Sequence, residues 1–259
     1  MKIAGCIEYD GSRFCGWQIQ HGQPTVQEAV EKALTDIADH PVRVHCAGRT
    51  DTGVHACGQV FHFETDSQRS EFNWVMGVNT KLPVGASLIW TKEVDQDFHA
   101  RFSAVSRRYR YVLLNRQVRP SYLAKRVSWF PRSLDLERMR EAASSLIGTH
   151  DFSAFRSSRC RNKVPVKTVT TLDVGQAENW FWFDVEASGF LHHMVRNFVG
   201  VLLSIGCGDQ DTDWARRVLE QKDRTLAGIT APADGLYFVS VSYPEEHPLP
   251  TIPPPCRYW

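Results

Sequence analysis

The sequence has no excess of charge of either sign, with 30 Lys and Arg residues against 29 Asp and Glu and a net charge of +1. This balance excludes a protein that is basic over its whole surface, although it allows a basic patch on one face. Long hydrophobic runs are also absent, because the longest, around 198–205, is far shorter than a membrane span. The N-terminus meets Glu8 and Asp10 too early for a signal-peptide apolar region, so we expect neither a secretory signal nor a membrane anchor.

Cysteines at metal-binding spacing are missing as well. The seven cysteines are odd in number and scattered, and none forms a Cys-x-x-Cys pair, which is typical of reduced thiols in a cytoplasmic protein. His45, Cys46, His55 and Cys57 lie close in sequence, but their spacing matches no zinc pattern, and strand alternation would point His45 and Cys46 to opposite faces. We therefore expect no metal site and a cytoplasmic location.

Length and composition indicate an ordinary globular protein of one large or two small domains, with 259 residues of which 42% are hydrophobic. Hydrophobic periodicity predicts a mixed α and β chain. Strands are expected at 3–9, 42–46, 58–63, 87–94, 108–114, 166–174, 180–187 and 235–243, and helices at 26–37, 72–79, 134–146, 190–205 and 212–221. The second half loosely repeats the element order of the first, which suggests a weak internal duplication. We place an N-terminal subdomain at 1–100, a C-terminal subdomain at 101–247, and an extended proline-rich tail at 248–259.

The near-neutral total hides two segments without acidic residues. Residues 98–134 contain no Asp or Glu but nine Lys and Arg, and residues 152–172 contain five Lys and Arg, again without an acid. Such runs are often solvated strand faces and loops. They are equally what a surface that binds phosphates requires.

The most informative segment is the loop Ala47–Ala56, with the sequence AGRTDTGVHA, between two expected strands. Gly53 allows a tight turn after Asp51, and Arg49 is a plausible charge partner that would keep the carboxylate ionised. Asp51 is either a turn former that caps backbone amides or a reactive group on a loop carried by a rigid sheet. Asp-Thr-Gly also occurs in aspartic proteases, but that chemistry needs two carboxylates sharing a proton, and this chain has one such tripeptide, preceded by Arg-Thr rather than an apolar run.

Five further motifs accompany this loop along nearly the whole chain. They are Tyr9-Asp10-Gly11 with Phe14, Gly16, Trp17 and Gln18; Thr25-Val26-Gln27; Phe98 to Ala104 with Arg108 to Tyr111; Phe190-Leu191 with His193 to Asn197; and Thr230 to Ala233 with Gly235-Leu236. In this order, and together with the loop, they resemble the motifs of the TruA-type tRNA pseudouridine synthase family. One small departure is His192, where that family more often has Arg.

The resemblance implies an isomerase that converts uridine in tRNA to pseudouridine without any cofactor or metal. It implies Asp51 as the catalytic nucleophile, Arg196 as a guanidinium that keeps the carboxylate ionised, and Tyr109 as a ring that stacks on the uracil and handles the C5 proton. Arg49 would contact RNA phosphate or help to eject the uridine, and Leu236 would pack beneath the base. Because strand alternation separates them from Tyr109, Arg108 and Arg110 are candidates for phosphate contacts.

The fold implied by the resemblance is α+β, with two similar α/β subdomains, each an antiparallel sheet backed by helices, related by a pseudo-twofold around a central active-site cleft. The implied substrate is the anticodon stem-loop of tRNA at positions 38, 39 and 40, and the implied assembly is a homodimer. The target base must leave its stack, so recognition should depend on shape and phosphates. The alternative function is a catalytically inactive RNA-binding module of the same fold.

Overall fold

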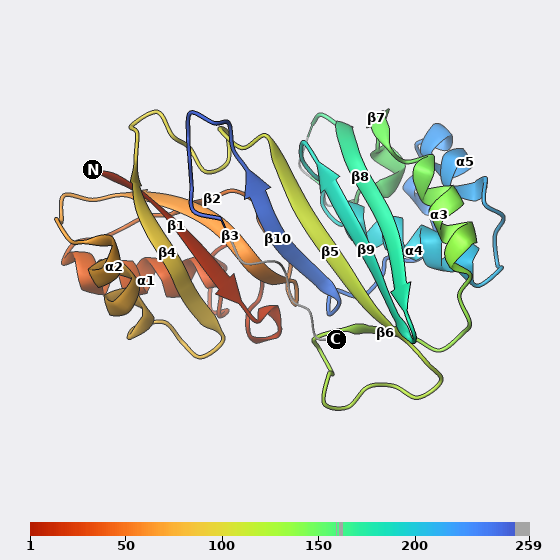
Figure 1. The fold of residues 1–259 in the computed structure, drawn as a ribbon, viewed down its shortest axis with the longest axis horizontal. Coiled ribbons are helices and arrows are strands. Elements are labelled where there is room, and N and C mark those ends of the chain that lie inside the picture. The colour runs from red at the N-terminus through yellow and green to blue at the C-terminus, as the bar shows by residue number, and fades with distance from the viewer. Residues whose placement is uncertain (159, 161–162, 252–259) are drawn as a thin grey trace. The chain divides into compact units, whose positions relative to one another are not determined.

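A computed structural model describes residues 1–158, 160 and 163–251, and the chain divides into two compact units. The first unit is Met1–Arg107 with Tyr237–Trp259, and the second unit is Arg108–Leu236 (Figure 1). Each unit combines strands with helices, which confirms the expected α+β class. Across the described ranges, no helix is long and apolar enough to cross a membrane. The subdomain limits expected at residues 100 and 247 stay predictions, and most of the expected tail, 252–259, lies outside the described residues.

The first unit is built on a mixed sheet. Its strands are β1 (Lys2–Tyr9), β2 (His45–Cys46), β3 (His55–Glu64), β4 (Ala86–Val94) and β10 (Leu236–Ser242). Their order is β4-β1-β3-β10, with β2 paired to β3. β1 is antiparallel to β3 and β4, whereas β10 is parallel to β3. The expectation of purely antiparallel sheets is therefore wrong, because β10 enters from a long crossover rather than from a hairpin.

Two helices cover one face of this sheet, α1 (Val26–Ala38) and α2 (Glu71–Asn79) (Figure 1). α1 buries Val26, Val30 and Leu34, whose spacing places them on one face of a helix. It ends at Asp39, which adopts a left-handed φ of 60° as helix ends commonly do. α2 begins after Ser70, whose side chain accepts the hydrogen bond of a free backbone N–H in the first turn.

The second unit also has a mixed sheet with its helices gathered on one face (Figure 1). Its strands are β5 (Ser106–Asn115), β6 (Ser128–Phe130), β7 (Gly148–Asp151), β8 (Val166–Ala177) and β9 (Trp180–Ala187). Their order is β5-β9-β8-β7, and the short β6 runs parallel to β5. The helices are α3 (Leu136–Ser144), α4 (Met194–Gly206) and α5 (Trp214–Gln221). In α4 all residues except Arg196 and Ser204 are buried, as befits a helix at the centre of a core.

The predicted elements occur in the predicted order, with differences at their ends. The helix expected from residue 190 begins at Met194, because His193 has a left-handed φ of 66° that interrupts any helix before it. β3 begins at His55 rather than at 58, so the loop before it spans only 47–54. The sequence did not predict β6 and β7, which have three and four residues and are too short to show a period.

Candidate active site

Asp51 lies in a short loop between β2 and β3 of the first unit. The loop closes on itself, since the backbone N–H of Val54 donates to the carbonyl oxygen of Asp51 over 3.1 Å. Gly53 has a φ of +82°, which permits this turn at no steric cost. Asp51 is partly buried, whereas Thr50 is only 7% exposed. The carboxylate is thus carried on a backbone whose conformation is fixed from both sides.

The motif at 9–17 fixes the first half of this loop. The hydroxyl groups of Tyr9 and Thr50 are 2.7 Å apart, and the backbone N–H of Trp17 donates to the carbonyl oxygen of Thr50 over 3.0 Å. A Cβ at Gly16 would lie 2.8 Å from that same oxygen, and Gly16 has a φ of +82°. Burial raises the pKa of Tyr9, so its phenol remains a neutral hydrogen-bonding group. Two motifs that are far apart in sequence therefore form one structure.

Gly11 fixes the second half of the loop. A Cβ at this position would lie 2.1 Å from the carbonyl oxygen of Val54, so the two backbone segments are in direct contact. The N–H of Gly11 donates to Nδ1 of His55 over 3.1 Å, and Asp10 Oδ1 lies 3.4 Å from the same nitrogen. His55 is buried and stacks on Tyr237 at a ring separation of 4.6 Å. Only a residue without a side chain fits at position 11.

The base of the loop is fixed by Gln59, whose side chain is fully buried. Its amide donates to the carbonyl oxygen of Gly48 over 2.5 Å and accepts from the N–H of Gly48 over 3.3 Å. The N–H of Ala47 donates to Val60 across the strand pair. A Cβ at Gly48 would lie 2.9 Å from the ring of Phe238 on β10. No sequence pattern predicts this role of Gln59, because glutamines are usually exposed.

Arg49 differs from its neighbours because its side chain is exposed. Within the described part of the chain it forms neither a hydrogen bond nor an ion pair, so the proposed charge pair of Arg49 with Asp51 is not formed. An unpaired guanidinium on a rigid loop is well suited to bind a phosphate in two-pronged geometry. The Arg49 guanidinium is therefore accessible at the surface of the first unit.

In the second unit, Tyr109 lies on β5 and is 8% exposed. Phe190 meets its ring edge-to-face, with 4.9 Å between the centroids. Tyr111 is on the same face of the strand but is fully buried, and its hydroxyl bonds to Ser128 and to the carbonyl oxygen of Pro232. Of the two tyrosines, Tyr109 has the larger exposed fraction.

The opposite face of β5 carries Arg108 and Arg110, and both lie against Asp184 on β9. Arg110 makes two hydrogen bonds to the carboxylate, of 2.8 and 2.6 Å, while Arg108 lies 3.4 Å away. The side chain of Arg110 is 17% exposed and that of Arg108 is 41% exposed. The contact with Asp184 gives Arg110 a structural role, and Arg108 retains more of its surface for a phosphate.

Arg196 lies in the first turn of α4, the most apolar helix of the molecule. Its Nε donates to the carbonyl oxygen of Ala231 over 2.7 Å, and the N–H of Ala231 donates back to the carbonyl oxygen of Arg196 over 3.1 Å. The motif at 230–236 is thereby joined to the motif at 193–197. Leu236, at the end of this segment, is 5% exposed, and its backbone N–H donates a hydrogen bond to the carbonyl oxygen of Ala233. Asp51 and Arg49 belong to the first unit, and the other predicted site residues belong to the second.

The four His and Cys residues near the loop have other contacts. His45 is exposed and stacks on His62, with 5.1 Å between the ring centroids. Nδ1 of His55 accepts a hydrogen bond from the backbone N–H of Gly11. Burial raises the pKa of Cys46 to about 12, so its thiol stays protonated. Cys57 is a partly buried, reduced cysteine. His45 and His55 thus each stack on another ring within the first unit.

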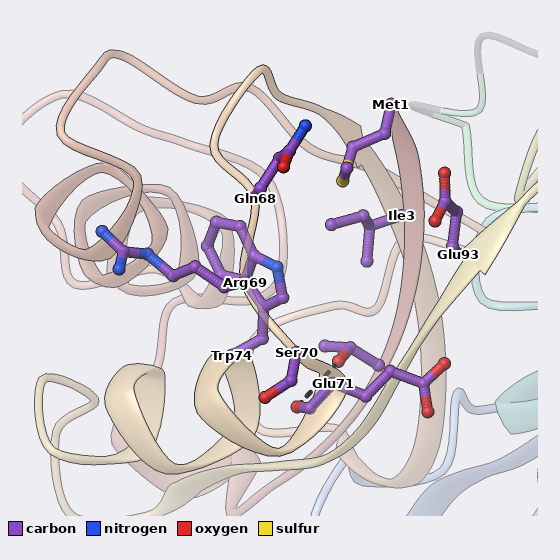
Figure 2. Close-up of a pocket in the computed structure, with 9 residues that line it drawn as sticks. Met1, Ile3, Gln68, Arg69, Ser70, Glu71, Trp74 and Glu93 are labelled. Carbon is purple, nitrogen blue, oxygen red and sulfur yellow. Dashed lines mark hydrogen bonds between the residues drawn. The ribbon is translucent and has the colours of Figure 1, made fainter.

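A pocket of about 480 Å³ lies elsewhere in the first unit, between β1 and the start of α2 (Figure 2). Met1, Ile3 and Trp74 line it, together with Arg69 and Glu71. The indole Nε1 of Trp74 is buried and has no hydrogen-bond partner among the described residues. None of the predicted site residues contributes to this pocket, so it is separate from the loop that carries Asp51.

Comparison with known proteins gives consistent matches. A family described as tRNA pseudouridine synthase matches residues 6–103 and 142–244. The chain is 48% identical over 259 residues to a protein of Nitrosococcus oceani named tRNA pseudouridine synthase A, covering 100% of both chains. It is 51% identical over 253 residues to the protein of that name from Aeromonas hydrophila, covering 98% of this chain and 94% of that one. A chain of a solved structure titled Crystal Structure of a Cbf5-Nop10-Gar1 Complex is 14% identical with a TM-score of 0.34, covering 78% of this chain and 45% of that one, which is too weak to support an inference.

Proposed function

The chain belongs to the tRNA pseudouridine synthase family, and we propose that it isomerises uridines 38, 39 and 40 in the anticodon stem-loop of tRNA, with Asp51 as the nucleophile. The activity class follows from the full-length similarity to relatives named tRNA pseudouridine synthase A. One structural observation carries the assignment of Asp51. Buried contacts from Tyr9, Gly11 and Trp17 fix its loop on either side of it, which is the preorganisation that a reacting group needs.

The reaction exchanges the bond between the base and C1′ of the ribose. The bond between N1 and C1′ breaks, the freed uracil rotates, and C5 bonds to C1′ while the hydrogen on C5 leaves as a proton and N1 gains a proton. No electron is gained or lost overall. A carboxylate can begin this sequence by attacking C1′, by adding to C6, or by removing a ribose proton, and all three routes require an ionised Asp51 next to the flipped nucleotide.

Two residues of the second unit complete the proposed machinery. Arg196 supplies a guanidinium that opposes protonation of the carboxylate, and its bond to Ala231 fixes the direction of its side chain. Tyr109 stacks on the uracil and takes the C5 proton after rotation, and Leu236 packs beneath the base. Stacking of a base on an aromatic ring is worth about 1–3 kcal/mol.

Basic residues contact the RNA backbone in this proposal. Arg49 binds a phosphate next to the target nucleotide, and the exposed part of Arg108 serves a second phosphate, whereas Arg110 is mainly bound to Asp184. The acid-free segments 98–134 and 152–172 supply further positive charge. We also infer a homodimer that binds tRNA through both subunits, which sedimentation of the free protein and of its tRNA complex tests.

The experiment measures tritium release from unmodified tRNA labelled at uridine C5. We expect release by the wild type and none by Asp51→Asn, with tRNA binding of this variant within threefold of wild type. Asp36→Asn is the matched control, because Asp36 is an exposed carboxylate on α1 of the same unit. Absence of release by folded wild type would refute the synthase assignment and favour the RNA-binding module. Normal release by Asp51→Asn would refute only the choice of nucleophile.

A further inference from the structure

Phe102 is exposed on the surface of the first unit. The residue is 76% exposed, although a phenylalanine gains about 1.5–3 kcal/mol from full burial. The His99 ring packs against the Phe102 ring at an interplanar angle of 36°, with 4.3 Å between the centroids, and the Arg101 guanidinium carbon lies 5.5 Å from the ring centroid. Most of the ring therefore remains available to another planar group.

The loop that carries Phe102 is rigid. The N–H groups of Arg101 and Phe102 both donate to Nδ1 of His99, over 3.1 and 3.3 Å. The hydroxyl of Ser103 accepts from the N–H of His99 over 3.0 Å, and the N–H of Ser103 donates back to the carbonyl oxygen of His99. These four bonds fix the turn around one imidazole. The backbone beneath the ring is thus already ordered, so a ligand that stacks on Phe102 need not offset the entropy of ordering that backbone.

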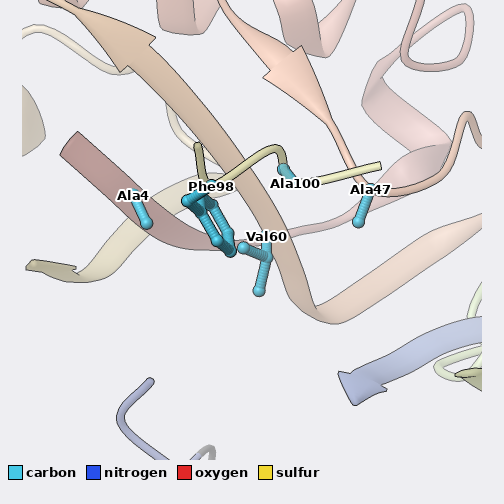
Figure 3. Packing of buried hydrophobic residues seen from close by; sticks show 5 residues of the cluster. All are labelled: Ala4, Ala47, Val60, Phe98 and Ala100. Atoms are coloured by element: carbon cyan, nitrogen blue, oxygen red, sulfur yellow. The ribbon is translucent and has the colours of Figure 1, made fainter. Parts of the chain in front are cut away.

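The same loop is tied to the loop of Asp51. The Arg107 guanidinium donates to the carbonyl oxygens of Arg101 and Ala104 on one side and to that of Ala47 on the other, over 2.5, 3.1 and 3.3 Å. Ala47 also packs in one buried cluster with Phe98 and with its neighbours from β1 and β3 (Figure 3). Phe102 is thus fixed relative to the exposed Arg49, two residues beyond Ala47.

The charge of the surroundings selects the partner. Arg49 and Arg101 are both exposed, and the Arg101 guanidinium lies beside the Phe102 ring. Phe102 lies in the acid-free segment 98–134. The acids that precede it, Asp95 and Asp97, gather with His247 instead. An exposed ring with a guanidinium beside it suits a nucleobase, because the base stacks on the ring and its phosphates carry the charge opposite to that of the guanidinium.

We propose that the exposed ring of Phe102, together with the Arg101 guanidinium, is a stacking platform for one unpaired nucleobase of the tRNA, separate from the nucleotide that reacts at Asp51. This inference rests on the proposed function, because it takes tRNA as the substrate. The base stacks on the ring while Arg101 and Arg49 bind the adjoining phosphates. The platform fixes the RNA next to the loop of Asp51 and contributes affinity rather than chemistry.

The test compares Phe102→Ala and Phe102→Trp with Phe72→Ala. Phe72 is the matched control, since it is 71% exposed in the same unit but lies on α2. The probe is an anticodon stem-loop hairpin in which single loop purines are replaced in turn by 2-aminopurine. We expect Phe102→Ala to weaken hairpin binding about tenfold and to remove the fluorescence quenching at one loop position. Phe102→Trp restores both, and Phe72→Ala changes neither.

The outcomes separate this proposal from the proposed function. At saturating enzyme, single-turnover tritium release by Phe102→Ala stays within threefold of wild type, and wild-type release itself reports on the synthase assignment. Unchanged binding and quenching in Phe102→Ala overturn the platform even if the wild type is fully active. A changed sedimentation coefficient with unchanged RNA binding also overturns it, and assigns Phe102 to a contact between protein chains.

Discussion

Replacing Gly11 by Ala tests whether buried contacts from the first motif fix the loop of Asp51. Gly11 has no left-handed φ, so Ala is compatible with the backbone there. Space is the obstacle, because the new Cβ would lie 2.1 Å from the carbonyl oxygen of Val54 and 2.9 Å from the backbone nitrogen of His55. Both contacts are to backbone, so no side chain can rotate away to relieve them.

The structure sets the size of the expected effect. Ordinary contact begins at 3.4 Å, so the methyl group and Val54 must separate by about 1.3 Å. Val54 is hydrogen-bonded to Asp51 across the turn, and the displacement is therefore transmitted to the carboxylate. A misplacement of about 1 Å can cost about 100-fold in rate, or roughly 2.7 kcal/mol in the barrier. The overpacking itself should lower the free energy of unfolding by about 1–3 kcal/mol.

The assay is single-turnover tritium release from C5-labelled tRNA with the enzyme in excess, alongside tRNA binding and urea unfolding. We expect Gly11→Ala to react about 100-fold more slowly while binding tRNA within threefold of wild type, because the exposed surface is unchanged. Gly22→Ala is the control. It introduces a side chain at a φ of +69° with nothing within 4 Å, so it should lose about 1–2 kcal/mol of stability but no activity.

A folded Gly11→Ala protein that reacts at the wild-type rate would refute this reasoning. It would show that the loop adapts to the methyl group without moving Asp51, or that Asp51 is not the reacting group. Activity lost equally in Gly22→Ala would also contradict it, since general instability would then explain both variants.

Three further predictions follow from other contacts. Arg110→Ala should lower the free energy of unfolding in urea by about 2–4 kcal/mol, since Asp184 loses its two short bonds, while Arg108→Ala should cost under about 1 kcal/mol. Burial and the neighbouring imidazoles lower the pKa of His62 to about 3 from 6.5. As the pH falls, the unfolded chain takes up this proton near pH 6.5, whereas the folded protein takes it up only near pH 3. The stabilisation from a neutral His62 is therefore complete above about pH 6.5 and is lost as the pH falls toward 3. Urea midpoints should fall over that window, and they should fall less in His62→Gln. Arg196→Lys should slow tritium release at least about tenfold with tRNA affinity nearly unchanged, because Lys cannot reproduce the bond from Nε to Ala231.

Secondary structure could be predicted from the sequence wherever a segment was long enough to show a period. Helix α1 and strand β9 are examples, because their buried residues recur with the helical and strand spacings. The start of α4 could not be predicted, since apolar residues continue upstream and only the backbone of His193 shows the interruption. The parallel pairing of β10 with β3 depends on the return of the chain to the first unit, which no local pattern encodes.

The sequence proposes members of a candidate site, but it does not show what those residues contact. The motif loop identified Asp51 and Arg49, yet the approach of Gly11 to Val54 joins residues 43 positions apart and becomes visible only in three dimensions. In the same way, Asp184 lies 74 residues from Arg110, so the sequence alone assigned both arginines of β5 to phosphates. Contacts of this kind depend on strand register, which periodicity does not specify.

Burial divides the motif residues of the first unit into two groups that the sequence presents as one. Thr50 is 7% exposed and is bonded to Tyr9, whereas its neighbour Arg49 is exposed and Phe102 is 76% exposed. Thr50 is hydrogen-bonded inside its own unit, so its replacement acts through the geometry of the loop and changes the rate of the chemical step. An exposed residue meets the RNA first and changes affinity. Gly11→Ala should therefore slow the reaction with little effect on tRNA binding, and Phe102→Ala should weaken tRNA binding with little effect on the rate. Comparing the loss of rate with the loss of affinity in each variant tests whether buried and exposed motif residues have these different roles.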